Sequence, residues 1–282
     1  MKQFHRVFIY AVLTLFAVYF LLPLVVMLFS SFKDLGEIRS GNLIMPPASP
    51  TIEPWIKAWG EACTGLNCDG VKSYFINSFL ITVPAVFLAS AIGAINGYIL
   101  AKWRFRGSEV FFAFMLLGCF IPFQAVLLPM AQTLGFLGLA NSLPGLILVH
   151  TVYGVPFTTL FYRNYYVGIP TELISAAKLD GAGFFQTFYR IVLPISAPII
   201  IVTVIWEFTN IWNDFLFGVI YSGPASQPIT VALNNLVNTS TGVKEYNVDM
   251  AAAMIAALPT IIVYIVSGKY FLRGLVAGAV KG

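Results

Sequence analysis

The sequence contains few charged residues and almost none of the groups that build chemical centres. Only 10% of the 282 residues are charged, whereas 59% are hydrophobic. An average soluble domain carries about 25% charged residues, so a soluble enzyme domain is excluded, and so is a disordered chain. Several uncharged apolar segments exceed the roughly 18 residues that indicate a membrane helix. The composition therefore predicts an integral membrane protein.

Motifs of catalysis and nucleotide binding are also missing. The chain has no G-x-x-x-x-G-K-[ST] phosphate loop, no H-E-x-x-H and no zinc-type Cys/His spacing, and its only histidines are His5 and His150. His150 falls within a predicted span, where an ionisable residue is a functional candidate. A hydrogen bond from His150 to a neighbouring carbonyl is the favoured interpretation. We expect no catalytic residue, no metal and no cofactor bound by this chain.

The neutral apolar windows predict an all-α membrane protein with six transmembrane helices. The period-two alternation of a membrane barrel is absent, so helices are the spanning element. The first helix is expected to be retained, because its apolar stretch is too long for a signal peptide and no cleavage site follows. We expect one transmembrane domain over residues 1–282, with helices at about 7–31, 74–101, 110–132, 143–162, 193–220 and 250–268. The connections are outside loops at 32–73 and 221–249 and an inside loop at 163–192. The loop 221–249 faces the substrate or is a plain connector.

The distribution of Lys and Arg sets the orientation. The two termini, residues 102–109 and residues 163–192 together hold eleven of the 16 basic residues and three of the 12 acidic ones. Basic residues accumulate on the cytoplasmic side, so we expect a multi-pass protein of the cytoplasmic (inner) membrane with both termini cytoplasmic. The net charge of +4 then reports topology, and no nucleic acid is expected as a partner.

The cysteines agree with this orientation. Cys63 and Cys68 lie in the first outside loop, where a disulfide is permitted. They either form a small disulfide loop or remain two unpaired thiols. Cys119 falls within a predicted helix and is expected to pack there.

The most informative segment is the inside loop that leads to Pro194. Thr171 and Glu172 suit the first turn of a short helix, and Gly181 suits its C-terminal stop. A second short helix is expected over about 184–192. A helix lying on lipid headgroups would have a strongly basic face. Because the acids and bases of this loop are balanced, a docking element for a soluble partner is favoured.

This loop resembles the EAA motif of permease subunits in binding-protein-dependent ATP-binding-cassette (ABC) importers. The motif reads E-A-A-x-x-x-G, then nine residues, then I-x-L-P. The sequence has Ser175-Ala176-Ala177-Lys178-Leu179-Asp180-Gly181 and Ile191-Val192-Leu193-Pro194. Asn77-Ser78, Trp212-Asn213-Asp214-Phe215 and the tail from Arg273 to Gly282 are similar to the carbohydrate-uptake branch, in particular its maltose-type six-helix subunit. One departure is Ser175 in place of the motif Glu; whether Glu172, one turn earlier, replaces it stays open.

The resemblance implies a type I ABC importer permease fold with a cytoplasmic coupling helix. It implies one half of a sugar translocation path, completed by a homologous permease subunit in a heterodimer. Two separate ATPase subunits would bind ATP and Mg²⁺ and dock on residues 163–194, and an extracytoplasmic binding protein would deliver a hexose or small oligosaccharide. The residues implied in coupling are Glu172, Ser175, Ala176, Ala177, Asp180, Gly181 and Pro194.

Polar residues within the fifth span are candidates for the substrate path. Glu207 lies about 21 Å along the helix from Leu193, past the bilayer centre. Carboxylates and amides bind hydroxyl groups, and indole faces pack on sugar rings. The candidates are Trp206, Glu207, Asn210, Asn213 and Asp214. The alternative is that these groups hydrogen-bond across a helix interface.

A competing class is a self-sufficient ion-coupled secondary transporter or channel that uses Glu207. Such proteins often contain paired internal repeats, and no convincing repeat is visible in this sequence. This class would also leave the cytoplasmic loop without a purpose.

Overall fold

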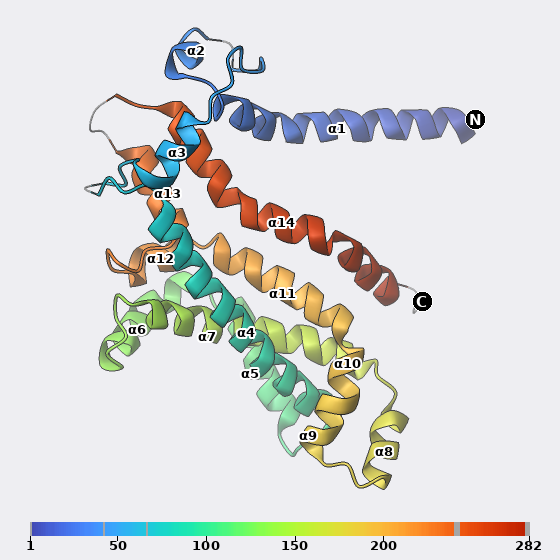
Figure 1. Ribbon diagram of the computed structural model, residues 1–282. Coiled ribbons are helices and arrows are strands. Elements are labelled where there is room, and N and C mark those ends of the chain that lie inside the picture. Colours follow the sequence, from blue (N-terminus) through green and yellow to red (C-terminus); the bar gives the residue numbers. More distant parts are fainter. Residues whose placement is uncertain (1, 42, 66, 240–242, 280–282) are drawn as a thin grey trace. The chain divides into compact units, whose positions relative to one another are not determined.

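The computed structural model describes residues 2–41, 43–65, 67–239 and 243–279, and they form helices joined by short connections (Figure 1). The tail residues Val280, Lys281 and Gly282, which belong to the carbohydrate-branch resemblance, lie outside the described residues. The helices are α1 (Lys2–Ser30), α2 (Leu35–Arg39), α3 (Glu53–Gly60), α4 (Lys72–Lys102), α5 (Ser108–Phe120), α6 (Phe123–Phe136), α7 (Leu143–Val167), α8 (Thr171–Leu179), α9 (Phe184–Thr187), a π-helical turn (Phe188–Val192), α10 (Leu193–Ile195), α11 (Ala197–Trp212), α12 (Leu216–Tyr221), α13 (Ile229–Asn238) and α14 (Tyr246–Ala279). The all-α class is confirmed.

Long apolar helices account for the predicted spans. In the part of the chain that is described, four segments are long and apolar enough to cross a membrane, and two bent helix pairs bring the number to six if each pair is one span. The four are Gln3–Ser30, Lys72–Lys102, Leu143–Val167 and Tyr246–Gly268. The bent pairs are α5 with α6, at 102°, and the α9–α10 segment with α11, at 79°.

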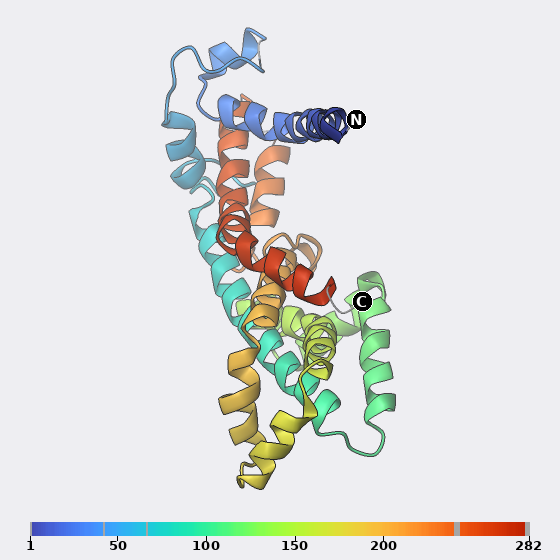
Figure 2. The ribbon, with the colours of Figure 1, turned by 90° about the vertical axis from the view of Figure 1, so that its right-hand side faces the viewer.

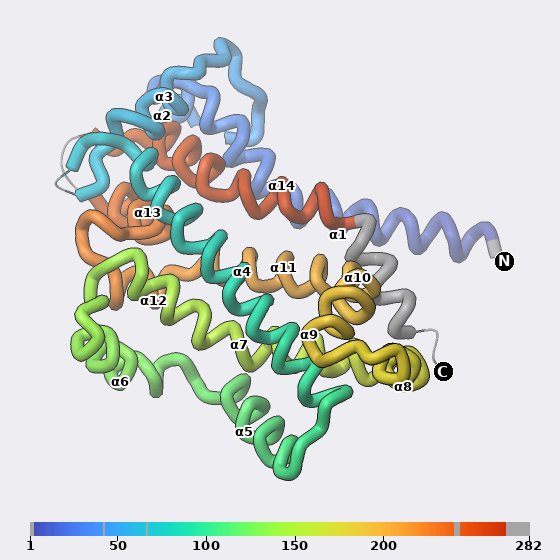
Figure 3. Tube along the Cα trace, turned by 60° about the horizontal axis from the view of Figure 1, so that its bottom comes forward, coloured from blue at the N-terminus to red at the C-terminus, as the bar shows by residue number. Residues whose placement is uncertain are grey.

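The breaks in these pairs differ from the expected continuous helices. Residues 110–132 were expected to form one helix, but Ile121 and Pro122 are extended and α5 and α6 are separate rods (Figure 3). A residue before proline is disfavoured in the α conformation, which places the break at Ile121. Residues 193–220 were also expected to be one helix. There the chain is already helical from Phe184, turns at Ser196 and leaves the helix after Trp212.

The chain divides into two compact units, of which one comprises residues 1–75 and 231–258. In this unit α1 runs away from α2 and α3 (Figure 1), and no residue of its most apolar window is buried. The expected outside loops contain helices, namely α2 and α3 in the first and α13 in the second. The two loops are linked by ion pairs and hydrogen bonds: Lys57 Nζ lies 2.5 Å from a Glu245 carboxylate oxygen, and Asn247 Nδ2 donates to Lys33 O at 3.0 Å. Cys63 and Cys68 are joined by a disulfide in the structure.

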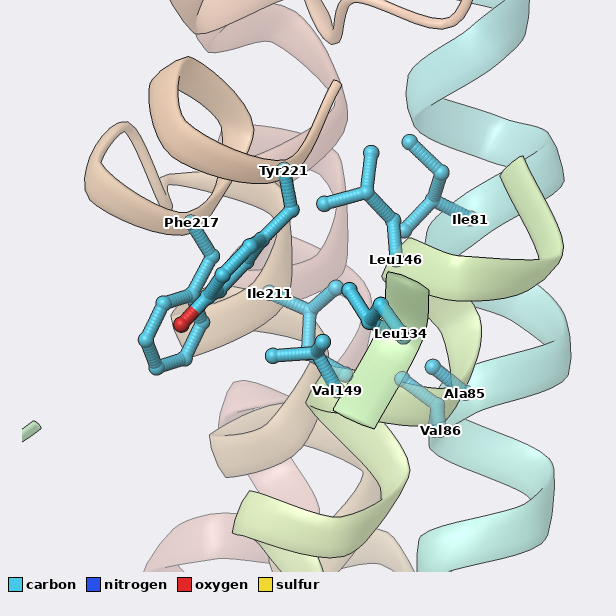
Figure 4. Packing of buried hydrophobic residues seen from close by; sticks show 9 residues of the cluster. All are labelled: Ile81, Ala85, Val86, Leu134, Leu146, Val149, Ile211, Phe217 and Tyr221. Carbon is cyan, nitrogen blue, oxygen red and sulfur yellow. The ribbon is translucent and has the colours of Figure 1, made fainter. Parts of the chain in front are cut away.

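The other unit comprises residues 76–230 and 259–282. Its apolar core contains Ile81, Ala85 and Val86 of α4, Leu134 of α6, Leu146 and Val149 of α7, Ile211 of α11, and Phe217 and Tyr221 of α12 (Figure 4). Asn77 and Ser78 fix the entry to α13. The Asn77 side chain donates to Ala225 O and Gln227 O, and Ser78 Oγ accepts from Ile229 N at 2.9 Å.

Helices α4 and α7 approach each other closely at two glycines. A Cβ atom on Gly93 would lie 2.2 Å from Thr158 Oγ1, and one on Gly97 would lie 2.7 Å from Arg163 N. The spacing Gly93-x-x-x-Gly97 is the small-residue pattern that permits close packing of membrane helices. Thr158 Oγ1 also donates to Ala89 O at 2.8 Å across this contact. The two helices therefore form a tightly packed pair.

We predict that Gly93→Ala destabilises this unit by about 1–3 kcal/mol, because the new methyl group overpacks the α4–α7 contact. The measurement is thermal denaturation of the detergent-solubilised protein, with a lowered midpoint as the expected result. Gly135→Ala is the matched control, since a Cβ there meets no atom within 4 Å. Equal midpoints for the two variants would contradict the packing argument.

Candidate functional site: a short capped helix and a polar cavity

The segment expected to couple to a partner begins with the short helix α8, which lies with α9 at one end of its unit (Figures 1 and 2). Pro170 stands at the N-cap and Glu172 lies in the first turn. At the C-terminal end, Gly181 N donates to Lys178 O at 3.0 Å and Ala182 N to Ala177 O at 2.9 Å. These two bonds, with Gly181 at φ +82°, form a Schellman motif. The predicted stop at Gly181 is thus observed.

Helix α8 has one buried face and one exposed face. Ile174 and Ala177 are buried, and Ile174 belongs to an aromatic cluster with Tyr98, Tyr166 and Phe188. Of the residues implied in coupling on this helix, only Ala177 is buried, whereas Ser175 and Ala176 are exposed. On the side of the helix opposite to Ile174 and Ala177, the exposed residues are Glu172, Ser175, Ala176 and Leu179. Leu179 is 90% exposed, and sequence reasoning did not single it out.

After the turn at residues 180–183, the connection from α8 to α11 is helical from Phe184 to Ile195. It comprises α9, the π-helical turn and α10, which contains Pro194. Val192 is fully buried against the same aromatic cluster. The helix turns at Ser196, whose Oγ donates to Val192 O at 2.5 Å. The chain between α8 and α11 is therefore ordered by helices, packing and hydrogen bonds.

A cavity of about 490 Å³ lies among α7, α11 and the break between α5 and α6. Four of the five predicted path residues line it: Trp206, Glu207, Asn210 and Asp214. Asn213 does not; it follows the last residue of α11, and its side chain donates back to Thr209 O at 2.9 Å. Trp212 is also turned away from the cavity and stacks on Phe208, with ring centroids 5.6 Å apart.

Glu207 is the most deeply buried acid of the cavity wall. Its side chain packs against Gly154, where a Cβ would lie 2.6 Å from Oε1. Glu207 is 2% exposed, and in the described chain its Oε1 has no hydrogen-bond partner. Trp206 beside it packs between Phe157 and Phe161, at centroid distances of 4.8 and 5.3 Å. The wall therefore contains a carboxylate with one buried, unpartnered oxygen next to an indole.

Helix α7 supplies cavity residues that the sequence reasoning did not assign to the path. His150, Tyr153, Gly154 and Phe157 line the cavity and recur at i, i+3, i+4 and i+7. This helical period was the signal that could have identified them. His150 Nε2 lies 3.8 Å from Asp214 Oδ2, so His150 belongs to the cavity wall as well as to the packing of α7.

Fold and site together define a helical membrane protein with a polar cavity among its spans and a short capped helix at one end of the unit that holds the cavity. Residues 91–276 match the family model of binding-protein-dependent transport system inner membrane components, and the chain belongs to this family. It is a permease subunit of an ABC importer. Such a subunit is not itself an enzyme, because the ATPase is a separate subunit. A self-sufficient secondary transporter is not favoured.

Curated relatives cover most of the chain. A probable ABC transporter permease of Pyrococcus horikoshii is 46% identical over 66% of this chain and 68% of its own length. A xylose/arabinose import permease of Haloferax volcanii is 30% identical over 96% of this chain and 92% of its own. A glucose import permease of Saccharolobus solfataricus is 30% identical over 97% of this chain and 95% of its own length. In a crystal structure of a bacterial ABC transporter that imports alginate, one chain has TM-score 0.83 and 20% identity, covering 96% of this chain and 97% of that one. This likeness confirms the type I permease fold.

We predict that Gly181→Val reduces ATP-dependent uptake several-fold without removing the protein from the membrane. The left-handed conformation costs a residue with a Cβ about 1–2 kcal/mol, and a β-branched residue is still less compatible with it. No atom lies within 4 Å of a Cβ at Gly181, so the effect is conformational. Uptake and membrane abundance are measured together.

Two further variants test whether the effect of Gly181→Val arises from the left-handed backbone conformation. Gly181→Asn is expected to be milder, because Asn tolerates the left-handed conformation. Gly183→Ala is the matched control: its φ is −77° and a Cβ there meets nothing within 4 Å, so uptake is expected to be unchanged. Wild-type uptake in Gly181→Val would show that the loop is not the coupling element.

Proposed function

We propose that this chain is one transmembrane half of an ATP-driven sugar importer in the cytoplasmic (inner) membrane. A homologous permease subunit completes the path as a heterodimer, and two ATPase subunits bind ATP and Mg²⁺. An extracytoplasmic sugar-binding protein delivers the substrate. Both termini are cytoplasmic, in keeping with the concentration of Lys and Arg in the segments assigned to that side. In this orientation the loop with Cys63 and Cys68 lies outside, where a disulfide persists.

Two independent lines support a sugar as the substrate. Relatives over more than nine tenths of the chain are import permeases for xylose and arabinose, for diacetylchitobiose and for glucose. The cavity combines the acceptors Glu207 and Asp214, the amide of Asn210 and the indole of Trp206. The carboxylates and the amide can bind sugar hydroxyl groups, and the apolar face of a sugar ring can pack on the indole. A hexose or small oligosaccharide is the proposed substrate.

The exposed face of α8 is the proposed docking surface for the ATPase. It presents Leu179 as an apolar side chain for a partner, flanked by Glu172, Ser175 and Ala176. Glu172 shares this face with Ser175, which supports Glu172 as the replacement for the acid of the motif. Ala177 anchors the opposite face, while Asp180 and Gly181 form the cap. Pro194 lies in α10, within the helical segment that would carry the motion into the membrane.

Co-purification tests the assembly. The tagged chain is extracted in mild detergent and its companions are identified by mass spectrometry. We expect a second permease and an ATPase with a Walker motif, and we expect Leu179→Glu to lose the ATPase, because it places a charge at the centre of an apolar contact. A solitary or homodimeric chain that moves solute without ATP would overturn the proposal.

We predict that Asn210→Ala raises the KM for sugar uptake, whereas Asn213→Ala leaves it unchanged. Both variants remove an amide near the end of α11, but only Asn210 lines the cavity. Loss of one hydrogen bond of about 1 kcal/mol corresponds to a roughly fivefold change. Uptake of labelled sugar in proteoliposomes is the measurement. If the two variants behave alike, the cavity is not part of the path.

A further inference from the structure

Residue Trp103, directly after the last residue of α4, contacts α4 itself and both short helices, α8 and α9, of the coupling segment (residues 168–195). Its indole Nε1 donates to Tyr98 Oη at 2.5 Å, which fixes the ring against α4. Lys178 Nζ of α8 lies 4.2 Å from the centroid of the same ring, a cation–π distance. Phe184, the first residue of α9, packs edge-on against it at 5.4 Å. One side chain therefore joins α4 to both helices of the segment.

The neighbouring residue makes a second connection of the same kind. Lys102 Nζ donates to Ile169 O at 2.5 Å, just ahead of α8. The end of α4 thus holds the segment before α8, the last turn of α8 and the start of α9. Of the residues on α8, Ile174 and Ala177 supply the apolar contacts, and neither touches the outer face on which a partner would dock. The cation–π contact is a directional link that apolar packing does not provide.

We infer that Trp103 is a positioning residue, which through Lys178 transmits displacement of the coupling helix α8 to the membrane helix α4. The inference rests on the proposed function, since it presumes that an ATPase moves α8. It assigns a role to a residue outside the EAA motif and to the motif position of Lys178, which the resemblance leaves unspecified. Neither residue contacts the cavity or lies on the exposed face of Glu172, Ser175, Ala176 and Leu179.

The test separates the charge from the side-chain stem. Lys178→Met keeps an unbranched apolar stem and removes the cation, whereas Lys178→Arg keeps a cation over the ring. Trp103→Leu removes the ring, and Trp103→Phe keeps an aromatic face without the Nε1 donor. Arg190→Met is the matched control, because it removes a positive charge from another exposed position of the same segment.

The readout is the number of ATP molecules hydrolysed per sugar transported by the reconstituted complex. We expect Lys178→Met and Trp103→Leu to raise this ratio about two- to fivefold, the range that a surface cation–π contact commands. Lys178→Arg and Arg190→Met are expected to keep the wild-type ratio, and Trp103→Phe to be intermediate. The double variant of Lys178→Met with Trp103→Leu is expected to be no worse than Trp103→Leu alone, because both remove one contact. A merely structural role would reduce the amount of assembled complex and leave the ratio per complex unchanged.

The outcomes distinguish failure of the proposed function from failure of the role assigned to Trp103 and Lys178. If the wild-type complex contains no ATPase, or moves sugar without ATP, the proposed function fails. If the wild type is ATP-driven but Lys178→Met keeps the wild-type ratio, or Lys178→Arg is as defective as Lys178→Met, only the role of Trp103 and Lys178 is overturned. Additive effects in the double variant would also contradict it.

Discussion

Inside a bilayer a backbone group without a partner costs several kcal/mol, and this constraint shapes the cavity of the protein. The break after α5 frees the carbonyl of Ile121, and Tyr153 Oη donates to it at 2.8 Å. After α11 the Asp214 carboxylate accepts from Phe217 N and Gly218 N and so caps α12. Tyr153 and Asp214 both line the cavity. The helix breaks and the polar lining are therefore one feature: the groups that repair the backbone are the groups that a hydroxylated substrate would meet.

In the coupling segment, the short helix α8 is held in place by its C-terminal cap and by packing on one face. An isolated helix of nine residues is not stable in water, so α8 needs both its cap and its packing. Gly181 closes the last turn, and Ile174 and Ala177 anchor one face in an aromatic cluster. This leaves the other face available while fixing its direction. A docking element that could rotate about its own axis would not convert a push into a movement of the membrane helices.

The parts that were predicted from sequence depend on local signals. Helix α8 was predicted because Thr171, Glu172 and Gly181 mark its two ends within a dozen residues. The break at Ile121 was missed, because the hydropathy of an apolar segment does not show where the direction of a helix axis changes. Asn213 was grouped with Asn210 because the helix was expected to continue to residue 220. The contact between Trp103 and Lys178 joins positions 75 residues apart, so no local pattern could reveal it.

The close contact between α4 and α7 connects the region of α8 and α9 with the cavity. Gly93 and Gly97 leave no room between the two helices, and close-packed elements transmit a displacement where loosely packed ones absorb it. Trp103, the residue after α4, touches α8 and α9, while α7 carries His150, Tyr153 and Gly154 of the cavity wall. Gly154 in turn packs against Glu207 of α11. Under the proposal for Trp103, a movement of α8 would pass through α4 and α7 by these contacts and would end at the Glu207 side chain in the cavity wall.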